Sequence, residues 1–119
     1  MLTVSDVFED VAVALESWSV AAAEATTVAG KNLQWVENEE PYRAMREALQ
    51  AANVDASTVK AVFSECLRGL AVSLLTVLDG GTAAAEKGRV YLVDERGQRL
   101  GEGLHDEFVA YLMETGRLA

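Results

Sequence analysis

Apolar residues recur every three or four positions through most of this chain, which is the spacing of one face of an α-helix. Acidic residues lie between them near the N-terminus, and Thr3 or Ser5 stands where a helix N-cap is expected. The pattern predicts an amphipathic first helix that ends between Ala25 and Gly30. Its apolar face contains Val4, Val7, Phe8, Val11, Leu15, Trp18 and Ala22.

Two further helices are predicted in the middle of the chain. Pro41, the only proline, fits the first position of a short helix over 41–52. A longer helix is predicted at about 56–79, capped by Asp55 or Ser57, and its second half is apolar nearly all round. We therefore expect this longer helix to be the buried, central helix of the fold.

The C-terminal third predicts a different kind of element. Residues 89–93 have the β-branched and aromatic content of a strand, and Asp94-Glu95-Arg96-Gly97 indicates a type I turn that returns the chain. A last helix is predicted at 104–115. We therefore expect an α+β fold that is mainly α, with about four helices around the central helix at about 56–79 and a C-terminal β-hairpin at about 89–100. Because a hairpin is marginal alone, it should lie against the helices or extend a sheet, as across a dimer.

Length and cysteine usage limit the organisation of the chain. At 119 residues it matches one domain, and we expect residues 1–119 to form a single one. Cys66 is the only cysteine, so no internal disulfide is available, and the acidic first ten residues do not resemble a secretory signal. We expect a cytoplasmic protein, and the excess of arginine over lysine together with abundant alanine indicates a GC-rich bacterial source.

Charge limits the classes of partner. Ten basic residues stand against nineteen acidic ones, a net charge of −9, which disfavours nucleic acid and anionic membranes because both are bound through Lys and Arg. The apolar run at 70–78 is about half of the roughly 20 residues that span a bilayer, which indicates a core helix. Neither a nucleic acid nor a membrane is expected as a partner.

The segment 31–42 is the first candidate site. Residues 31–40 of this segment have no clear helical period and place an aromatic side chain beside several carboxylates, a combination typical of protein-interaction hot spots. Trp35 alternatively pins the loop to the core, whereas Trp18, on the apolar face of the first helix, is expected to be a core residue. The residues predicted to bind a protein partner are Trp35, Glu37, Glu39, Glu40 and Tyr42.

The second candidate site surrounds the only histidine. A histidine beside carboxylates can act as a general base or bind a metal. Adjacent residues on a helix point about 100° apart, however, and no metal-binding or phosphate-loop motif is present, so we predict no metal, no cofactor and no catalytic residue. Cys66 is expected to be a small buried hydrophobe. The alternative pocket consists of His105, Asp106, Glu107 and Asp79.

Three functions follow as hypotheses. No motif identifies a family, but the composition of a small, acidic domain without a cofactor is similar to that of immunity proteins and antitoxins that cover basic toxins. This resemblance implies a protein-binding module that acts by surface complementarity, with a partner that is basic and without a catalytic step. The first alternative is a small enzyme or ligand-binding domain with a pocket near His105. The second is a homodimer that serves as an assembly element.

Overall fold

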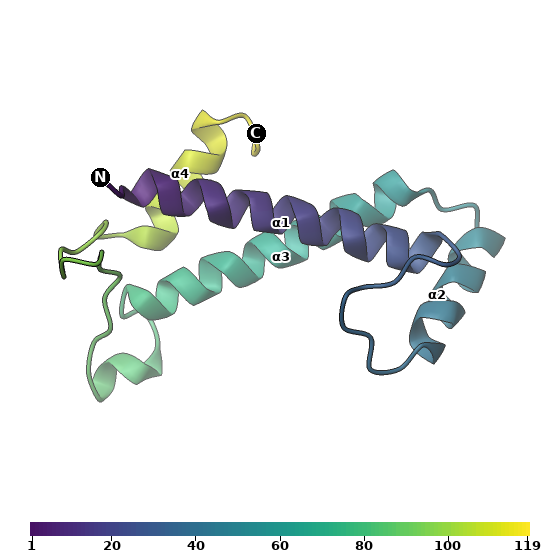
Figure 1. Ribbon diagram of the computed structural model, residues 1–119, viewed down its shortest axis with the longest axis horizontal. Coiled ribbons are helices and arrows are strands. Elements are labelled where there is room, and N and C mark those ends of the chain that lie inside the picture. Colours follow the sequence, from purple (N-terminus) through teal and green to yellow (C-terminus); the bar gives the residue numbers. More distant parts are fainter. The chain divides into compact units, whose positions relative to one another are not determined.

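The computed structural model describes residues 1–119, and all of its regular secondary structure is helical (Figure 1). Its helices are α1 (Val4–Thr27), α2 (Glu40–Ala51), α3 (Ala56–Leu78) and α4 (Leu104–Glu114), with a short 3₁₀ helix, η1 (Ala83–Glu86). The four α-helices lie where the apolar spacing predicts them, with ends that differ by one or two residues. No strand or sheet is present, so the predicted α+β class is wrong.

Side chains close the helix ends much as the sequence indicates. Thr3 and Asp6 form a reciprocal cap at the start of α1, in which the Thr3 N–H donates to Asp6 Oδ2 at 2.8 Å and the Asp6 N–H donates to Thr3 Oγ1 at 3.3 Å. Asp55 caps α3 by accepting the Thr58 N–H at 2.8 Å. Gly80, with a φ of +77°, ends α3 in the left-handed conformation that glycine adopts easily.

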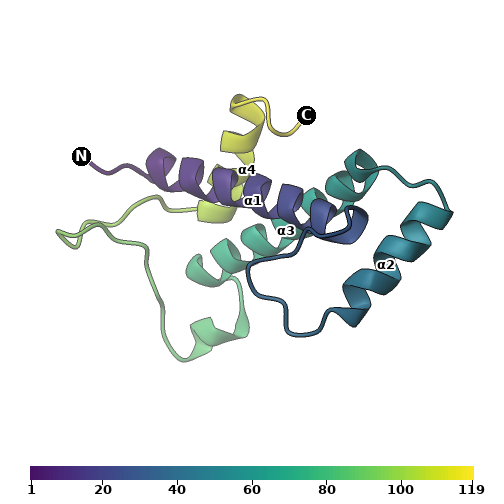
Figure 2. The same cartoon turned by 45° about the vertical axis from the view of Figure 1, so that its right-hand side comes forward.

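The chain forms two compact units, which share the two long helices. Unit 1 contains residues 1–13 and 68–119, and its core is aromatic. Phe108 of α4 is fully buried, and its ring centre lies 5.3 Å from that of Phe8 in α1. Figure 2 shows α4 crossing the N-terminal half of α1. The other buried side chains of this unit are Ala12, Ala71, Leu75, Leu104 and Leu112.

Unit 2 contains residues 14–67, which comprise the rest of α1, a loop, α2 and the first half of α3. Its buried positions are small or hydroxylated rather than aromatic. The hydroxyls of Ser19 and Thr26 donate to carbonyls one turn earlier in α1, at 2.7 Å and 2.8 Å, so neither is left without a partner. The remaining buried side chains are Ala23, Ala25 and Val59.

The predicted β-hairpin at 89–100 is wrong, although its turn forms. Gly97 has a φ of +79°, and its N–H donates to the Asp94 carbonyl at 3.0 Å, as a turn at 94–97 requires. The pairing stops after one antiparallel bridge, between Val93 and Arg99. Gly101, at a φ of +71°, then turns the chain away, and there is no further strand on which a short ladder could grow.

Helix α3 is less buried than a central helix should be. Ala71 and Leu75 face the core of unit 1, but Leu70 and Leu74 are 56% and 59% exposed. Cys66 is also exposed, which contradicts its predicted burial. The apolar stretch Ala56–Glu86 is long and apolar enough to cross a membrane, a test of length and composition that a core helix also passes.

Candidate functional site

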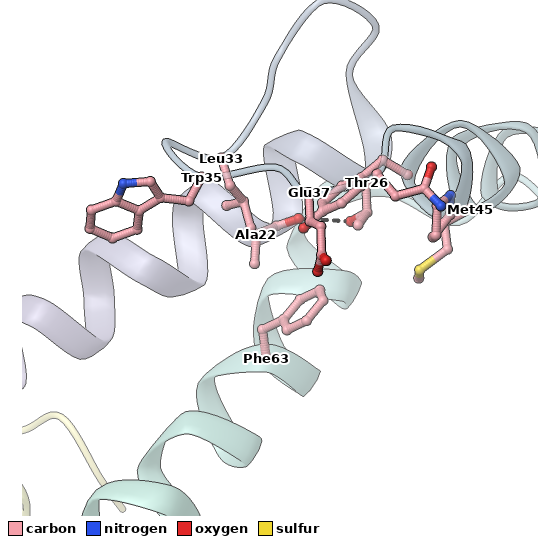
Figure 3. Close-up of a pocket in the computed structure, with 10 residues that line it drawn as sticks. Ala22, Thr26, Leu33, Trp35, Glu37, Met45 and Phe63 are labelled. Atoms are coloured by element: carbon pink, nitrogen blue, oxygen red, sulfur yellow. Dashed lines mark hydrogen bonds between the residues drawn. The ribbon is translucent and has the colours of Figure 1, made fainter.

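A pocket of about 550 Å³ lies within unit 2 and is open to solvent (Figure 3). The end of α1 forms one wall, the loop before α2 forms the second, and the start of α2 forms the third. Phe63 is the contribution of α3. The lining is mostly apolar and consists of Ala22, Thr26, Leu33, Trp35, Glu37, Asn38, Pro41, Tyr42, Met45 and Phe63.

Trp35 is held at the edge of this pocket by another tryptophan. Its ring stacks on that of Trp18, with ring centres 6.3 Å apart and an angle of 26° between the planes. Trp35 remains 73% exposed and Trp18 is 41% exposed, so the prediction that Trp18 belongs to the core is wrong. The stack fixes the loop against α1 and still leaves most of the Trp35 ring open to a partner.

The carboxylates of the loop and of the first residue of α2 differ in what they contact. Glu40 forms an ion pair with Arg43 one turn later in α2, and Glu39 lies 3.8 Å from Arg46. Arg46 also donates to the carbonyl of Ala25 at 2.8 Å, which satisfies one of the last carbonyls of α1. Glu37 forms no ion pair and lines the pocket, so it is the carboxylate that is free to meet a cation there.

The structure therefore brings together three of the five residues predicted to bind a partner. Trp35, Glu37 and Tyr42 line the pocket, whereas Glu39 and Glu40 lie beside it and are paired with arginines. Sequence analysis missed the contributions of α1 and α3, because an apolar position on a helix carries the same signal whether it faces a core or a cavity. The missed lining residues are Ala22, Thr26, Leu33, Asn38, Pro41, Met45 and Phe63.

The histidine group lies in unit 1, where α3 ends and α4 begins. Asp79, directly after α3, accepts the Leu104 N–H at 2.8 Å and the His105 N–H at 2.9 Å. One of its oxygens also contacts Nδ1 of the His105 ring. The carboxylate of Asp79 thus caps the first turn of α4, where free N–H groups and the helix dipole favour a negative charge.

This contact shifts the pKa of both partners. The hydrogen bond that the His105 ring donates to Asp79 raises the pKa of His105 above its ordinary value. Desolvation opposes this with a smaller effect, and the nearby charge of Asp106 acts in the same direction as Asp79. Burial by itself would raise the pKa of Asp79. The hydrogen bonds from the His105 N–H, the His105 ring and the Leu104 N–H together outweigh burial and hold that pKa below its ordinary value.

The structure brings Asp79 and Asp106 to the His105 ring, whereas Glu107 lies apart, so the four residues of the predicted alternative pocket do not form one pocket. Asp106 Oδ1 is 3.6 Å from His105 Nε2, but the Asp106 side chain is 88% exposed. Glu107 lies on another side of the helix, where its Oε1 accepts the Glu102 N–H at 3.3 Å. No three His, Cys, Asp or Glu side chains of the chain are grouped to hold a metal ion. The arrangement is that of a charged helix cap.

Comparison with known proteins adds no assignment. No protein-family model, no curated protein and no solved structure matches this chain.

Proposed function

We propose that this chain is a protein-binding module whose pocket in unit 2 receives an apolar side chain from a basic segment of a partner protein. The observation that carries the proposal is the open, apolar pocket beside the exposed Trp35 and the unpaired Glu37. Exposed aromatic anchors next to a pocket are the usual centres of protein interfaces, and a neighbouring carboxylate selects a partner that carries Lys or Arg.

The lining favours a protein side chain over a small polar metabolite. Ligand pockets usually combine apolar walls with a few convergent polar groups that fix the orientation of the ligand. Here the Thr26 hydroxyl already donates to the Ala22 carbonyl, and Asn38 Oδ1 already accepts the Glu40 N–H at 3.0 Å. Glu37 is left as the charged group of the lining, so contact in the pocket is mainly apolar.

Charge supports a basic partner. Residues 14–67 contain eight acidic and four basic side chains, and three of those basic side chains, Arg43, Arg46 and Lys60, are engaged with Glu40, Glu39 and Glu16. Attraction over a longer range would therefore favour the approach of a positively charged surface. Binding a basic partner in this way is the task of immunity proteins and antitoxins that cover basic toxins, and we propose this class of activity for the protein.

The test begins with affinity capture of the tagged protein from a host lysate, followed by calorimetric titration of the purified partner. We expect Trp35→Ala to weaken binding at least tenfold, and Glu37→Lys to weaken it further through charge repulsion. Reversing Glu39 and Glu40 together with Trp35→Ala should abolish binding while the helical circular dichroism is kept. Glu47→Lys is the matched control, because Glu47 is an exposed acid of α2 outside the pocket lining.

Two results would contradict the proposal. One is a captured partner that binds the Trp35→Ala and Glu37→Lys variants as tightly as it binds the unchanged protein. The other is a loss of affinity that is equal for Glu37→Lys and Glu47→Lys, which would show an effect of net charge without a role for the pocket.

A further inference from the structure

The segment 89–100 of unit 1, here called the edge segment, lacks partners for much of its backbone. Its only antiparallel bridge joins Val93 to Arg99. In this bridge the Asp94 N–H donates to the Gln98 carbonyl at 2.9 Å, and the Leu100 N–H donates to the Leu92 carbonyl at 2.8 Å. In that pattern Val93 and Arg99 are a non-hydrogen-bonded pair, so their own N–H and C=O groups point outward. None of the N–H groups of residues 89–93 donates a hydrogen bond within the protein.

The edge segment is not a strand in this structure, but its side chains are of the types that strands favour. Val90, Tyr91 and Val93 are 52%, 48% and 48% exposed, although valine and tyrosine favour a half-buried, pleated surface. Exposed backbone with unpaired N–H groups and apolar side chains is the kind of surface against which an extended peptide can pair its own backbone.

The charge of the edge segment is opposite to that of the chain as a whole. The guanidinium groups of Arg89 and Arg99 lie 5.4 Å and 4.4 Å from the centre of the Tyr91 ring, and neither arginine forms an ion pair. Asp94 forms no ion pair with either arginine, and its Oδ1 accepts the N–H groups of Arg96 and Gln98 inside the turn. A protein with a net charge of −9 thus carries two unpaired arginines around one tyrosine.

The position of Arg89 is set by the end of α3. A Cβ atom added to Gly80 would lie 2.4 Å from Arg89 Nε, so the arginine side chain packs directly over the glycine that ends the helix. This contact and the Tyr91 ring hold the guanidinium in place before any partner arrives, which reduces the entropy lost when it binds a carboxylate.

We propose that the edge segment binds an extended, acidic segment of a partner protein by strand addition. The backbone of the partner pairs with the outward groups of Tyr91 and Val93, and its carboxylates meet Arg89 and Arg99 beside the tyrosine ring. This surface is separate from the pocket of unit 2, and it selects the opposite charge. The chain therefore has one surface for a basic partner and another for an acidic one.

The test uses the full-length protein and a short acetylated peptide in which glutamate alternates with threonine or valine. In amide NMR spectra, we expect the N–H groups of Tyr91 and Val93 to shift and to become protected from hydrogen exchange on titration. The amides of Val90 and Leu92, which alternate with them, should gain no protection. The same peptide with lysine in place of glutamate should not bind.

Three variants test whether binding depends on the charge of Arg89 and on the backbone N–H of Val93. Arg89→Glu should weaken peptide binding at least tenfold, whereas Arg96→Glu, in the turn and away from Tyr91, should change it less than twofold. Val93→Pro removes one outward N–H donor and should abolish binding, and thermal unfolding checks that the helices remain.

Several outcomes overturn the proposal: no binding of the glutamate peptide, equal binding of the lysine peptide, or equal effects of Arg89→Glu and Arg96→Glu. Protection of Tyr91 and Val93 that appears without peptide and grows with protein concentration would also overturn it, because the occupant of the edge would then be a second copy of this chain.

Discussion

Replacing Asp79 tests whether the histidine group is a helix cap. The Asp79 side chain is 8% exposed and accepts two backbone N–H groups at the start of α4, at 2.8 Å and 2.9 Å, together with the His105 ring. Asp79→Ala removes the acceptor from all three donors. Asp79→Asn keeps one carbonyl oxygen and removes the charge, so the pair of variants separates geometry from electrostatics.

The expected magnitude follows from these contacts. Loss of an N-cap acceptor costs about 0.5–2 kcal/mol, and hydrogen bonds to a charged group contribute about 1.5–3 kcal/mol each. Because these terms overlap and water can reach part of the freed N–H groups, we expect Asp79→Ala to lower the free energy of unfolding by about 2–3 kcal/mol. For Asp79→Asn we expect about 1 kcal/mol, since one good acceptor remains.

The assay is urea unfolding followed by circular dichroism at neutral pH. Asp106→Ala is the matched control, because Asp106 is the neighbouring acid, lies near the same histidine and has a side chain that is 88% exposed. We expect the control to change the free energy of unfolding by less than about 0.5 kcal/mol. If Asp79→Ala and Asp106→Ala lowered the free energy of unfolding equally little, the Asp79 carboxylate would not be a cap that stabilises α4.

Two other predictions concern unit 1. The pKa of His105 is raised from its ordinary value of 6.5, so its contribution to stability should be complete below pH 6.5 and be lost as the pH rises through the raised pKa. The pKa of Asp79 is lowered from its ordinary value of 3.8, so its contribution should be present above pH 3.8 and be lost as the pH falls through the lowered pKa. NMR titration of the His105 ring should show the raised pKa and its return toward 6.5 in Asp79→Ala, and an unchanged titration would contradict the contact. In α3, Leu75 is 8% exposed and Leu74 is 59% exposed. Leu75→Ala should therefore lower the free energy of unfolding by about 2–4 kcal/mol, and Leu74→Ala by less than about 1 kcal/mol. Equal decreases in urea unfolding would show that Leu74 is buried in solution.

The helices of this chain were predictable because their signals are local. Apolar spacing, the Thr3 and Asp55 caps and the glycine after Asp79 act within one or two turns, so the sequence identifies all four α-helices nearly to the residue. The turn at 94–97 was predictable for the same reason, since Gly97 supplies the left-handed position.

The errors concern what lies beside an element. The content of 89–93 favours a strand, but a strand needs a neighbour, and only Arg99 meets Val93 in a bridge. Apolar positions of α3 were predicted to be buried, yet Leu70 and Leu74 are exposed while Leu75 is not. Periodicity gives the direction of an apolar face, and only the tertiary structure decides which part of that face is covered.

The candidate sites divide in the same way. The sequence indicates an aromatic and acidic segment around the start of α2, and three of its residues line the pocket: Trp35 and Glu37 of the loop and Tyr42 of α2. Only the tertiary structure decided that the end of α1 and Phe63 of α3 complete that pocket, and that Asp79 reaches the first turn of α4 across 26 residues. The difference arises from how far apart along the chain the interacting residues are. Helix formation and capping depend on residues within one or two turns, whereas cavities and paired charges depend on where distant segments meet.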